Sequence, residues 1–143
     1  MARIRIHVPE TYIATFNIPV RITDINYGNH VGNDAFVSLI HEARMQWLQQ
    51  NGHTELNIDG IGLIMSDIAV EFKNESLYGD MVEISISVDE ISKVSFELYY
   101  RLSTKRKTAT IVLANAKTAM VCFDYTNKKV AAIPEKLKAL LSN

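Results

Sequence analysis

The sequence predicts an α+β fold in which one long helix near the N-terminus is followed by a series of antiparallel strands. Apolar residues recur at helical spacing over residues 34–50. Five other segments carry the alternating or continuous apolar patterns of β-strands. One helix combined with about five strands, most of them consecutive along the chain, is typical of the α+β class.

The first strand and the helix can be placed by their local signals. Apolar and polar residues alternate over residues 12–22, which predicts a half-buried strand. Pro19 cannot donate a ladder hydrogen bond, so we expect this strand to be an edge strand or to contain a bulge. The helix should span residues 34–50, with Asn33 as its N-cap and Asn51-Gly52 as its end. Its many apolar positions favour a helix wrapped by a sheet.

After a predicted loop at residues 52–61, strand patterns follow almost without interruption. The expected strands are residues 63–72, 82–89, 95–102 and 110–123. The last of these is apolar on both faces, as a central strand should be. We expect a basic turn at residues 104–108 and a short C-terminal helix that begins at Pro134.

Composition limits the function. The chain has 143 residues, so residues 1–143 should form one domain. Its content of 48% hydrophobic and 22% charged residues is ordinary for a globular protein. A net charge of −1 argues against a nucleic-acid partner. The absence of a long apolar run argues against a membrane partner and a signal peptide, so a cytoplasmic protein is expected. Cys122 lies in an apolar strand pattern, which favours a buried, inert thiol.

The loop before the helix gathers most of the groups able to do chemistry. Within ten residues it holds Asp24, Asn26, Asn29, His30, Gly32 and Asn33. A helix start presents unpaired backbone N–H groups and a partial positive charge. A carboxylate close to such a start suits acyl transfer, because the N–H groups can stabilise an oxyanion.

The same stretch resembles a known family. The pattern D-x-[DN]-x-x-x-H-V-x-N, followed by an aromatic residue and by E-A-R in the helix, is similar to the 4-hydroxybenzoyl-CoA thioesterase branch of the hotdog-fold thioesterases. The matching residues are Asp24, Asn26, His30, Val31, Asn33, Phe36, Glu42, Ala43 and Arg44. A strand ending in an aromatic residue and a later Gly-Asp, here Phe72 and Gly79-Asp80, extend the resemblance, as does Trp47-Leu48 near the helix end.

The resemblance implies a hotdog fold, in which an antiparallel sheet of about five strands wraps around one long helix. It implies an acyl-CoA thioesterase that hydrolyses an acyl thioester to the free acid and coenzyme A, without a metal or other cofactor. The family pairs two hotdogs with sites at the shared interface, so a homodimer or homotetramer is expected.

The family pattern also implies roles for individual residues. Asp24 would be the nucleophile or the general base that activates water. His30 would orient the loop or polarise the thioester carbonyl. Asn26 stands where many members have a second aspartate, which disfavours a two-carboxylate mechanism, although plant acyl carrier protein thioesterases carry a related D-x-N-x-H-V-N-N. Asn29 replaces a common glycine, and asparagine tolerates positive φ.

Three further residues complete the predicted site. Gly32 and Asn33 would act through their backbone N–H groups as oxyanion or substrate donors, while Asn33 also caps the helix. Glu42 is a reserve catalytic candidate, because a related branch places its glutamate on this helix. It is otherwise a structural partner of Arg44 or of a loop.

Several alternatives stay open at the level of sequence. A non-catalytic acyl-CoA-binding hotdog and a hotdog hydratase or dehydratase are the rival functions, although the Pro/Gly-rich signature of the latter is missing. The acyl group and the carrier, coenzyme A or acyl carrier protein, are undetermined. The available cations for the coenzyme A phosphates are Lys73, Arg101, Lys105, Arg106 and Lys107.

Overall fold

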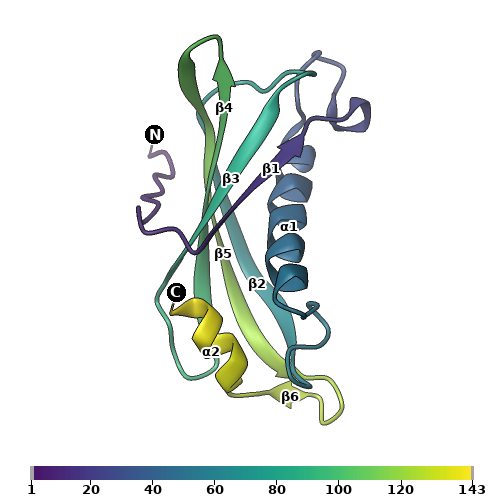
Figure 1. Cartoon of the computed structure of the whole chain (residues 1–143), viewed down its shortest axis with the longest axis vertical. Coiled ribbons are helices and arrows are strands. Elements are labelled where there is room, and N and C mark those ends of the chain that lie inside the picture. The colour runs from purple at the N-terminus through teal and green to yellow at the C-terminus, as the bar shows by residue number, and fades with distance from the viewer. Residues whose placement is uncertain (1, 143) are drawn as a thin grey trace.

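A computed structural model describes residues 2–142 of the chain and gives the element order shown in Figure 1. The elements are β1 (Ala14–Pro19), the 3₁₀ helix η1 (Ile22–Asp24), α1 (Asn33–Gln50), β2 (Gly62–Phe72), β3 (Met81–Asp89), β4 (Ser95–Arg106), β5 (Ala109–Asp124), β6 (Lys129–Val130) and α2 (Glu135–Leu141). The expected long helix, five long strands and short C-terminal helix are therefore confirmed. The two-residue strand β6 and the helix η1 were not expected.

The strands form one antiparallel sheet in the order β1-β3-β4-β5-β2, with β6 paired to β5. The sheet curves around α1, which lies along its concave face (Figure 1). β5 is flanked on both sides, as its two apolar faces predicted, whereas β1 and β2 are the edges. Pro19 predicted an edge strand or a bulge, and the first of these is confirmed, because β1, which ends at Pro19, is the outermost strand on one side of the sheet.

The core lies between α1 and the concave face of the sheet. Phe36, Ile40 and Trp47 line one side of α1 and are almost completely buried. They pack within one cluster that includes the inward residues of the sheet, such as Leu98 and Met120. Burial of these large side chains contributes roughly 1.5–3 kcal/mol each, so α1 is held mainly by its apolar face.

Two predicted boundaries differ from the structure for local reasons. β1 is shorter than residues 12–22, because the chain leaves the sheet after Pro19 and turns into η1. β4 continues through Arg106, so the basic turn is much tighter than residues 104–108. Lys107 makes this turn with a φ of 59°. Both differences arise where a turn, rather than side-chain periodicity, sets the end of a strand.

A polar network crosses the core from the middle of α1. Arg44 is 5% exposed in its side chain and donates to Glu55 Oε2 over 3.0 Å and to the Tyr100 hydroxyl over 3.2 Å. The Tyr100 hydroxyl also pairs with Thr118 Oγ1 at 2.7 Å, and His41 pairs with Glu55. The expected pairing of Glu42 with Arg44 is therefore wrong, because Glu55 in the following loop supplies the carboxylate instead.

Candidate active site

The polar loop between η1 and α1 is a tight turn closed by backbone hydrogen bonds. The Asn26 N–H donates to the His30 carbonyl over 2.9 Å, and the Asn29 N–H donates to the Asn26 carbonyl over 3.1 Å. Ile25 and Val31 form an isolated bridge beneath it. Asn29 has a φ of 63°, so the prediction that asparagine at this position preserves the turn is confirmed.

Asp24 ends η1, and its carboxylate turns back toward the end of β1. Its side chain is only 4% exposed. Oδ2 accepts the Arg21 backbone N–H at 2.8 Å, and Oδ1 lies 3.3 Å from Arg21 Nη2. The Asp24 carbonyl oxygen accepts the Gly32 N–H at 3.0 Å. The residue is thus anchored both to the strand before it and to the helix start after it.

Asn26 and His30 lie close together on either side of Gly28. The Asn26 Oδ1 accepts the Gly28 N–H at 2.9 Å. A Cβ atom at Gly28 would lie 3.2 Å from both Asn26 Oδ1 and His30 Nε2, so a larger residue there would push these side chains aside by a few tenths of an ångström. His30 Nδ1 lies 3.2 Å from the Val31 carbonyl, which can only accept, so Nδ1 carries the proton. His30 Nε2 lies 3.8 Å from Glu75 Oε1.

The start of α1 differs from its predicted form. Gly32, with φ −72° and ψ 159°, is the N-cap, and its carbonyl accepts the Phe36 N–H at 3.1 Å. Asn33 is therefore the first helical residue, and the prediction of Asn33 as N-cap is wrong by one position. Within residues 2–142, the backbone N–H groups of Asn33 and Asp34 have no acceptor, whereas the Gly32 N–H is bonded to Asp24. The helix dipole adds positive potential at this end.

Asn33 lines a pocket of about 220 Å³ between the helix start and the chain after β2. His30, Asn33 and Phe36 line one side, and Phe72 to Glu75 line the other. Phe36 and Phe72 meet edge to face, with ring centroids 5.3 Å apart. The pocket is therefore lined by two aromatic rings and by polar residues.

The structure brings only part of the predicted site into this pocket. His30 and Asn33 line it, and Asn26 lies next to His30. Of the residues described, Asp24 is not among those that line it. Asn74 and Glu75, which the sequence did not suggest, also line the pocket, with Glu75 Oε1 3.8 Å from His30 Nε2. Their position directly after the aromatic end of β2 is the signal that would have identified them.

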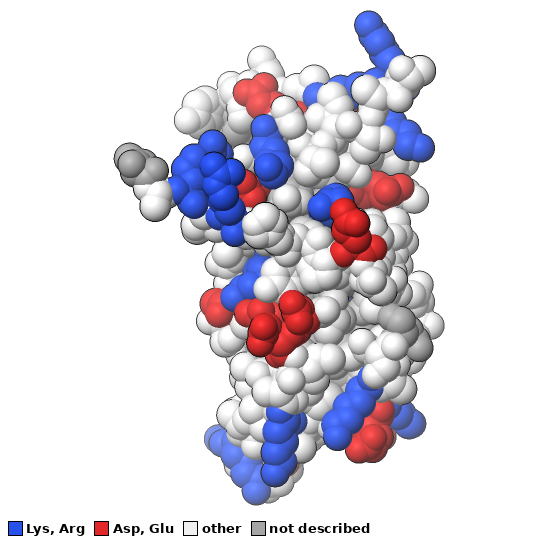
Figure 2. Space-filling model, turned by 90° about the vertical axis from the view of Figure 1, so that its left-hand side faces the viewer, with Lys and Arg blue, Asp and Glu red and all other residues white. Residues whose placement is uncertain are grey.

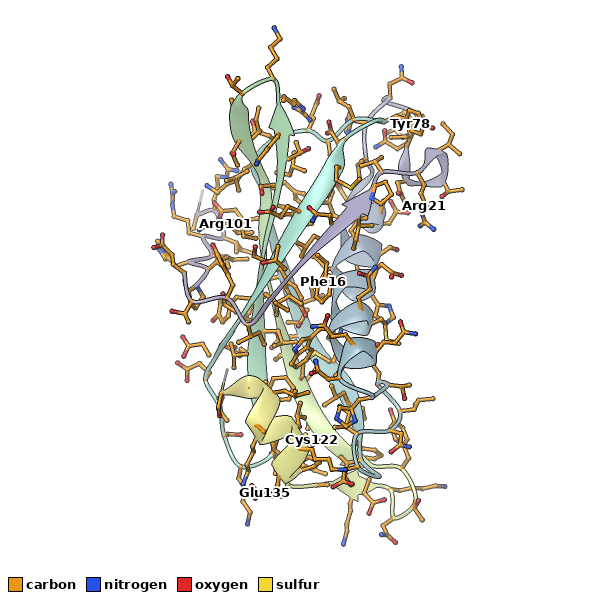
Figure 3. All side chains as sticks on the ribbon, viewed as in Figure 1. Phe16, Arg21, Tyr78, Arg101, Cys122 and Glu135 are labelled. Atoms are coloured by element: carbon orange, nitrogen blue, oxygen red, sulfur yellow. The ribbon has the colours of Figure 1, made fainter. Side chains whose placement is uncertain are left out.

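Glu42 lies elsewhere on α1. It is exposed, accepts a hydrogen bond from Gln46 Nε2 at 2.9 Å, and lines a separate groove of about 380 Å³ between α1 and β1. Arg21 lines the same groove, and Figure 3 places Arg21 at the end of β1 beside α1. The reserve catalytic candidate is therefore separated from the pocket that contains His30 and Asn33.

One of the predicted phosphate-binding cations has a structural partner. Arg106 Nη2 contacts Asp80 Oδ2 at 2.7 Å. Burial acts to raise the pKa of Asp80, but Arg106, the Leu77 N–H and Ser76 outweigh it and hold this pKa below its usual value. Gly79, with φ 99°, makes the turn that precedes Asp80. The Gly-Asp pair of the family pattern thus closes the loop that follows the pocket.

Other chemistry finds no support in the described part of the chain. No group of three or more metal-binding side chains occurs among residues 2–142. Burial raises the pKa of the Cys122 thiol to about 11, which confirms a buried, unreactive cysteine. No helix within the same residues combines the length and apolarity needed to cross a membrane.

Comparisons with known proteins identify the family to which this chain is similar. The sequence profile of the thioesterase-like superfamily matches residues 20–141. A 1,4-dihydroxy-2-naphthoyl-CoA hydrolase from Microcystis aeruginosa is 31% identical over 108 residues, which cover 71% of this chain and 73% of that protein.

Solved structures share the fold. A 1,4-dihydroxy-2-naphthoyl-CoA thioesterase from Synechocystis has a TM-score of 0.80 at 22% identity, covering 90% of this chain and 95% of that one. An aspartate-to-asparagine mutant of 4-hydroxybenzoyl-CoA thioesterase, in complex with 4-hydroxybenzoyl-CoA, has a TM-score of 0.78 at 17% identity, covering 90% and 97%. The hotdog fold expected from the sequence is confirmed.

Proposed function

The chain belongs to the thioesterase-like superfamily, and we propose that it hydrolyses an aromatic acyl-CoA thioester with Asp24 as its catalytic carboxylate. The class of reaction, thioester hydrolysis of an acyl-CoA, follows from the family and from the 31% identical hydrolase. The acyl group, the roles of individual residues and the assembly are the parts that we propose.

The observation that carries the proposal is the pocket beside the helix start. A thioester carbonyl placed there would point its oxygen at the Asn33 N–H, which has no acceptor within the described residues. Charge develops on this oxygen in the transition state, so an unpaired N–H at the positive end of α1 stabilises the transition state more than the substrate. His30 lines the same pocket and would orient the thioester or polarise its carbonyl.

The aromatic lining supports an aromatic acyl group. Phe36 and Phe72 line the pocket, and ring-on-ring contacts contribute roughly 0.5–1.5 kcal/mol beyond area burial. The relative from Microcystis aeruginosa is named for a bicyclic aromatic substrate. A flat acyl group of one or two rings therefore fits the pocket better than a long flexible chain.

Asp24 would act as nucleophile or as general base once its carboxylate, which faces Arg21 in this structure, turns toward the pocket. In the first case its oxygen attacks the carbonyl carbon, the C–S bond breaks, coenzyme A leaves as the thiol after protonation, and water hydrolyses the resulting anhydride. In the second case Asp24 takes a proton from water, whose oxygen attacks directly. Both give the free acid and coenzyme A, and Asn26, next to His30, would orient the water or substrate.

A second copy of the chain would complete the site. β2 is a sheet edge, and its Ile64, Met65 and Phe72 remain partly exposed. An exposed apolar edge strand favours pairing with another chain. Pairing of two copies through β2 would make a two-fold dimer and bring the pocket beside Phe72 to the shared interface. The cytoplasmic location expected from composition stays a prediction.

A substrate panel read by release of free thiol tests the proposed acyl group. We expect kcat/KM for 4-hydroxybenzoyl-CoA or 1,4-dihydroxy-2-naphthoyl-CoA to exceed that for octanoyl-CoA by about tenfold or more. Apolar contacts in a pocket discriminate between substrates by roughly 1–3 kcal/mol of transition-state binding. Phe72→Leu should reduce this preference, whereas Leu56→Ala, in an exposed loop, should leave it unchanged. Equal turnover of aromatic and straight-chain substrates would contradict an aromatic pocket.

Light scattering tests the assembly. The parent chain should be a dimer or a tetramer at micromolar concentration, and Met65→Lys should shift it toward the monomer and lower turnover together. A parent chain that is monomeric and fully active would exclude a site completed by a second copy.

A further inference from the structure

The N-terminal segment, residues 2–13, lies on the face of the sheet opposite α1 (Figure 1). Polar contacts hold it there. The Ile6 N–H donates to Glu71 Oε1 over 3.0 Å, and Asn115 Nδ2 donates to the Ile6 carbonyl over 3.4 Å. Arg101 Nη1 donates to the Tyr12 hydroxyl over 3.2 Å. The segment therefore bridges β2, β5 and β4 across the outer face of the sheet.

Between this segment and the sheet lies a polar cavity of about 250 Å³. Its floor is a cross-strand row, because Glu71 is paired in register with Asn115, and Asn115 with Arg101. Arg5 comes from the segment above. Figure 3 shows Arg101 beside the N-terminal segment, on the opposite side of the sheet from α1. This cavity and the pocket beside His30 have different linings except for Lys73, which lines both.

Two buried polar atoms in this floor lack hydrogen-bond partners within residues 2–142: Arg101 Nε, a donor, and Asn115 Oδ1, an acceptor. Asn115 is only 7% exposed. Its amide orientation is fixed, because Nδ2 must face the Ile6 carbonyl, which can only accept. An unsatisfied buried donor and acceptor each cost about as much as a lost hydrogen bond. A ligand that both accepts and donates would satisfy the two.

The charges around the cavity favour an anion. Among the described residues, no carboxylate lies within 4.0 Å of the half-buried Arg101 guanidinium. Arg5 adds a second cation at the rim, while Glu10 at the rim opposes it. Glu71 is already occupied by the Ile6 N–H and by Lys73, 3.6 Å away. Figure 2 shows Lys and Arg gathered beside the N-terminal segment on this face.

We propose that this cavity binds an oxyanion that retains a proton, namely inorganic phosphate. Its unprotonated oxygens accept from Arg101 Nε and neutralise the guanidinium, and its remaining O–H donates to Asn115 Oδ1. The preference for a protonated oxyanion comes from two hydrogen bonds together: a charge-assisted bond from arginine to the ion, and a bond from the O–H of the ion to the fixed Asn115 Oδ1. Because Ile6 and Tyr12 hold the residues of the floor, the bound ion also ties the N-terminal segment to the sheet.

Sulfate provides the decisive comparison. It has the size, shape and charge of phosphate but no proton at neutral pH, so it leaves Asn115 Oδ1 unpaired. Isothermal titration of the intact protein at fixed ionic strength and pH 7 should therefore show one phosphate per chain, bound about tenfold or more tightly than sulfate. Equal affinity for the two ions, or no phosphate binding, would overturn the proposal. Water would then be the hydrogen-bond partner of Arg101 Nε and Asn115 Oδ1.

Matched variants locate the site. Arg101→Met should weaken phosphate binding by about tenfold or more, and Arg5→Met, which alters an exposed side chain, by about threefold. Arg3→Met makes the same change in the same segment, but Arg3 does not line the cavity. The affinity of this variant for phosphate should therefore stay within about twofold of that of the parent. An Arg101→Met protein that melts like the parent and binds phosphate equally well would overturn the proposal.

Titration with AMP distinguishes a free phosphate ion from a phosphate monoester. A monoester loses its last proton with a pKa of about 6. If the cavity admits monoesters, AMP should bind like phosphate at pH 5.5 and like sulfate at pH 8. If only the free ion fits, AMP should not bind at either pH. Both results support the proposal, whereas AMP binding that is equally tight at both pH values would contradict the requirement for a proton.

Discussion

The first turn of α1 and the middle of the same helix both carry polar groups, but these groups differ in burial and in hydrogen bonding. In the middle, Arg44 is buried and contacts Glu55 and the Tyr100 hydroxyl. At the first turn, the N–H groups of Asn33 and Asp34 have no acceptor among the described residues. The polar groups of α1 thus have hydrogen-bond partners in the middle of the helix, where they support the fold. They lack protein partners at the helix start, beside the pocket.

This difference in hydrogen bonding indicates that the middle of α1 serves stability and the start of α1 serves function. A buried polar group with all its partners specifies how the core packs. The first N–H groups of a helix have no acceptor within the helix, and beside the pocket the thioester oxygen would be their acceptor. Removing groups from the two regions should therefore affect different measurements: turnover at the helix start, and the free energy of unfolding at Arg44.

Asp24→Asn should give the largest effect on turnover. The amide keeps the size of the side chain and one oxygen that can accept the Arg21 N–H, but it removes the negative charge and the basicity. We expect kcat to fall by roughly 10²–10⁴-fold, the usual scale for an acid–base group, with KM and Tm near the parent values. Thiol release and thermal melting measure these quantities.

A matched change controls for the loss of charge. Asp59→Asn removes a carboxylate from the exposed loop after the other end of α1, and kcat should stay within about twofold of the parent. If Asp24→Asn left kcat unchanged, Glu42→Gln would be the next variant. If that variant were also fully active, neither of these two carboxylates would be catalytic.

Arg44→Met should give the largest effect on stability. Methionine fills much of the space of the arginine stem, but Glu55 and Tyr100 lose a charged partner. Breaking a buried pair costs about 3–5 kcal/mol, and we expect the lower end because Glu55 keeps His41 and Tyr100 keeps Thr118. Urea denaturation measures this loss. Turnover per folded molecule should stay near the parent value, and a selective loss of turnover would contradict the division between the two regions.

The two regions also differ in how well the sequence revealed them. The polar loop, the aromatic residues Phe36 and Phe72, and the span of α1 were predictable, because motif spacing and helical periodicity are local signals. The partner of Arg44 was not. Glu55 is eleven residues away in a loop without periodicity, so only the folded path of the chain brings the two side chains together.

The helix start shows the same limit at shorter range. Asparagine is a better N-cap than most residues, which favoured Asn33 over Gly32 in the sequence. The bond from the Gly32 N–H to the Asp24 carbonyl holds Gly32 extended and moves the cap by one position. Capping preference alone does not contain this constraint.

Asn33→Pro tests the oxyanion donor with little change to the fold. Asn33 is the first helical residue, a position that tolerates proline, and Gly32 already has the extended conformation that a residue before proline requires. The substitution deletes one N–H. We expect kcat to fall about 100-fold, as for loss of one oxyanion donor, with Tm close to the parent. A fully active proline variant would exclude this N–H as a donor.

Asn33→Ala should give the smallest effect, and it completes the test. If the Asn33 side chain capped the helix, alanine would cost about 1 kcal/mol of stability. The structure assigns the cap to Gly32 and gives Asn33 no side-chain capping bond, so Tm should stay near the parent value. Alanine also keeps the backbone N–H, and kcat should therefore remain within about twofold of the parent, since the proposed donor is intact. If Asn33→Ala lost as much turnover as Asn33→Pro, the side-chain amide and not the backbone N–H of Asn33 would be the functional group. The unpaired N–H at the start of α1 would then have no role in turnover, and the contrast with the middle of the helix would not separate function from stability.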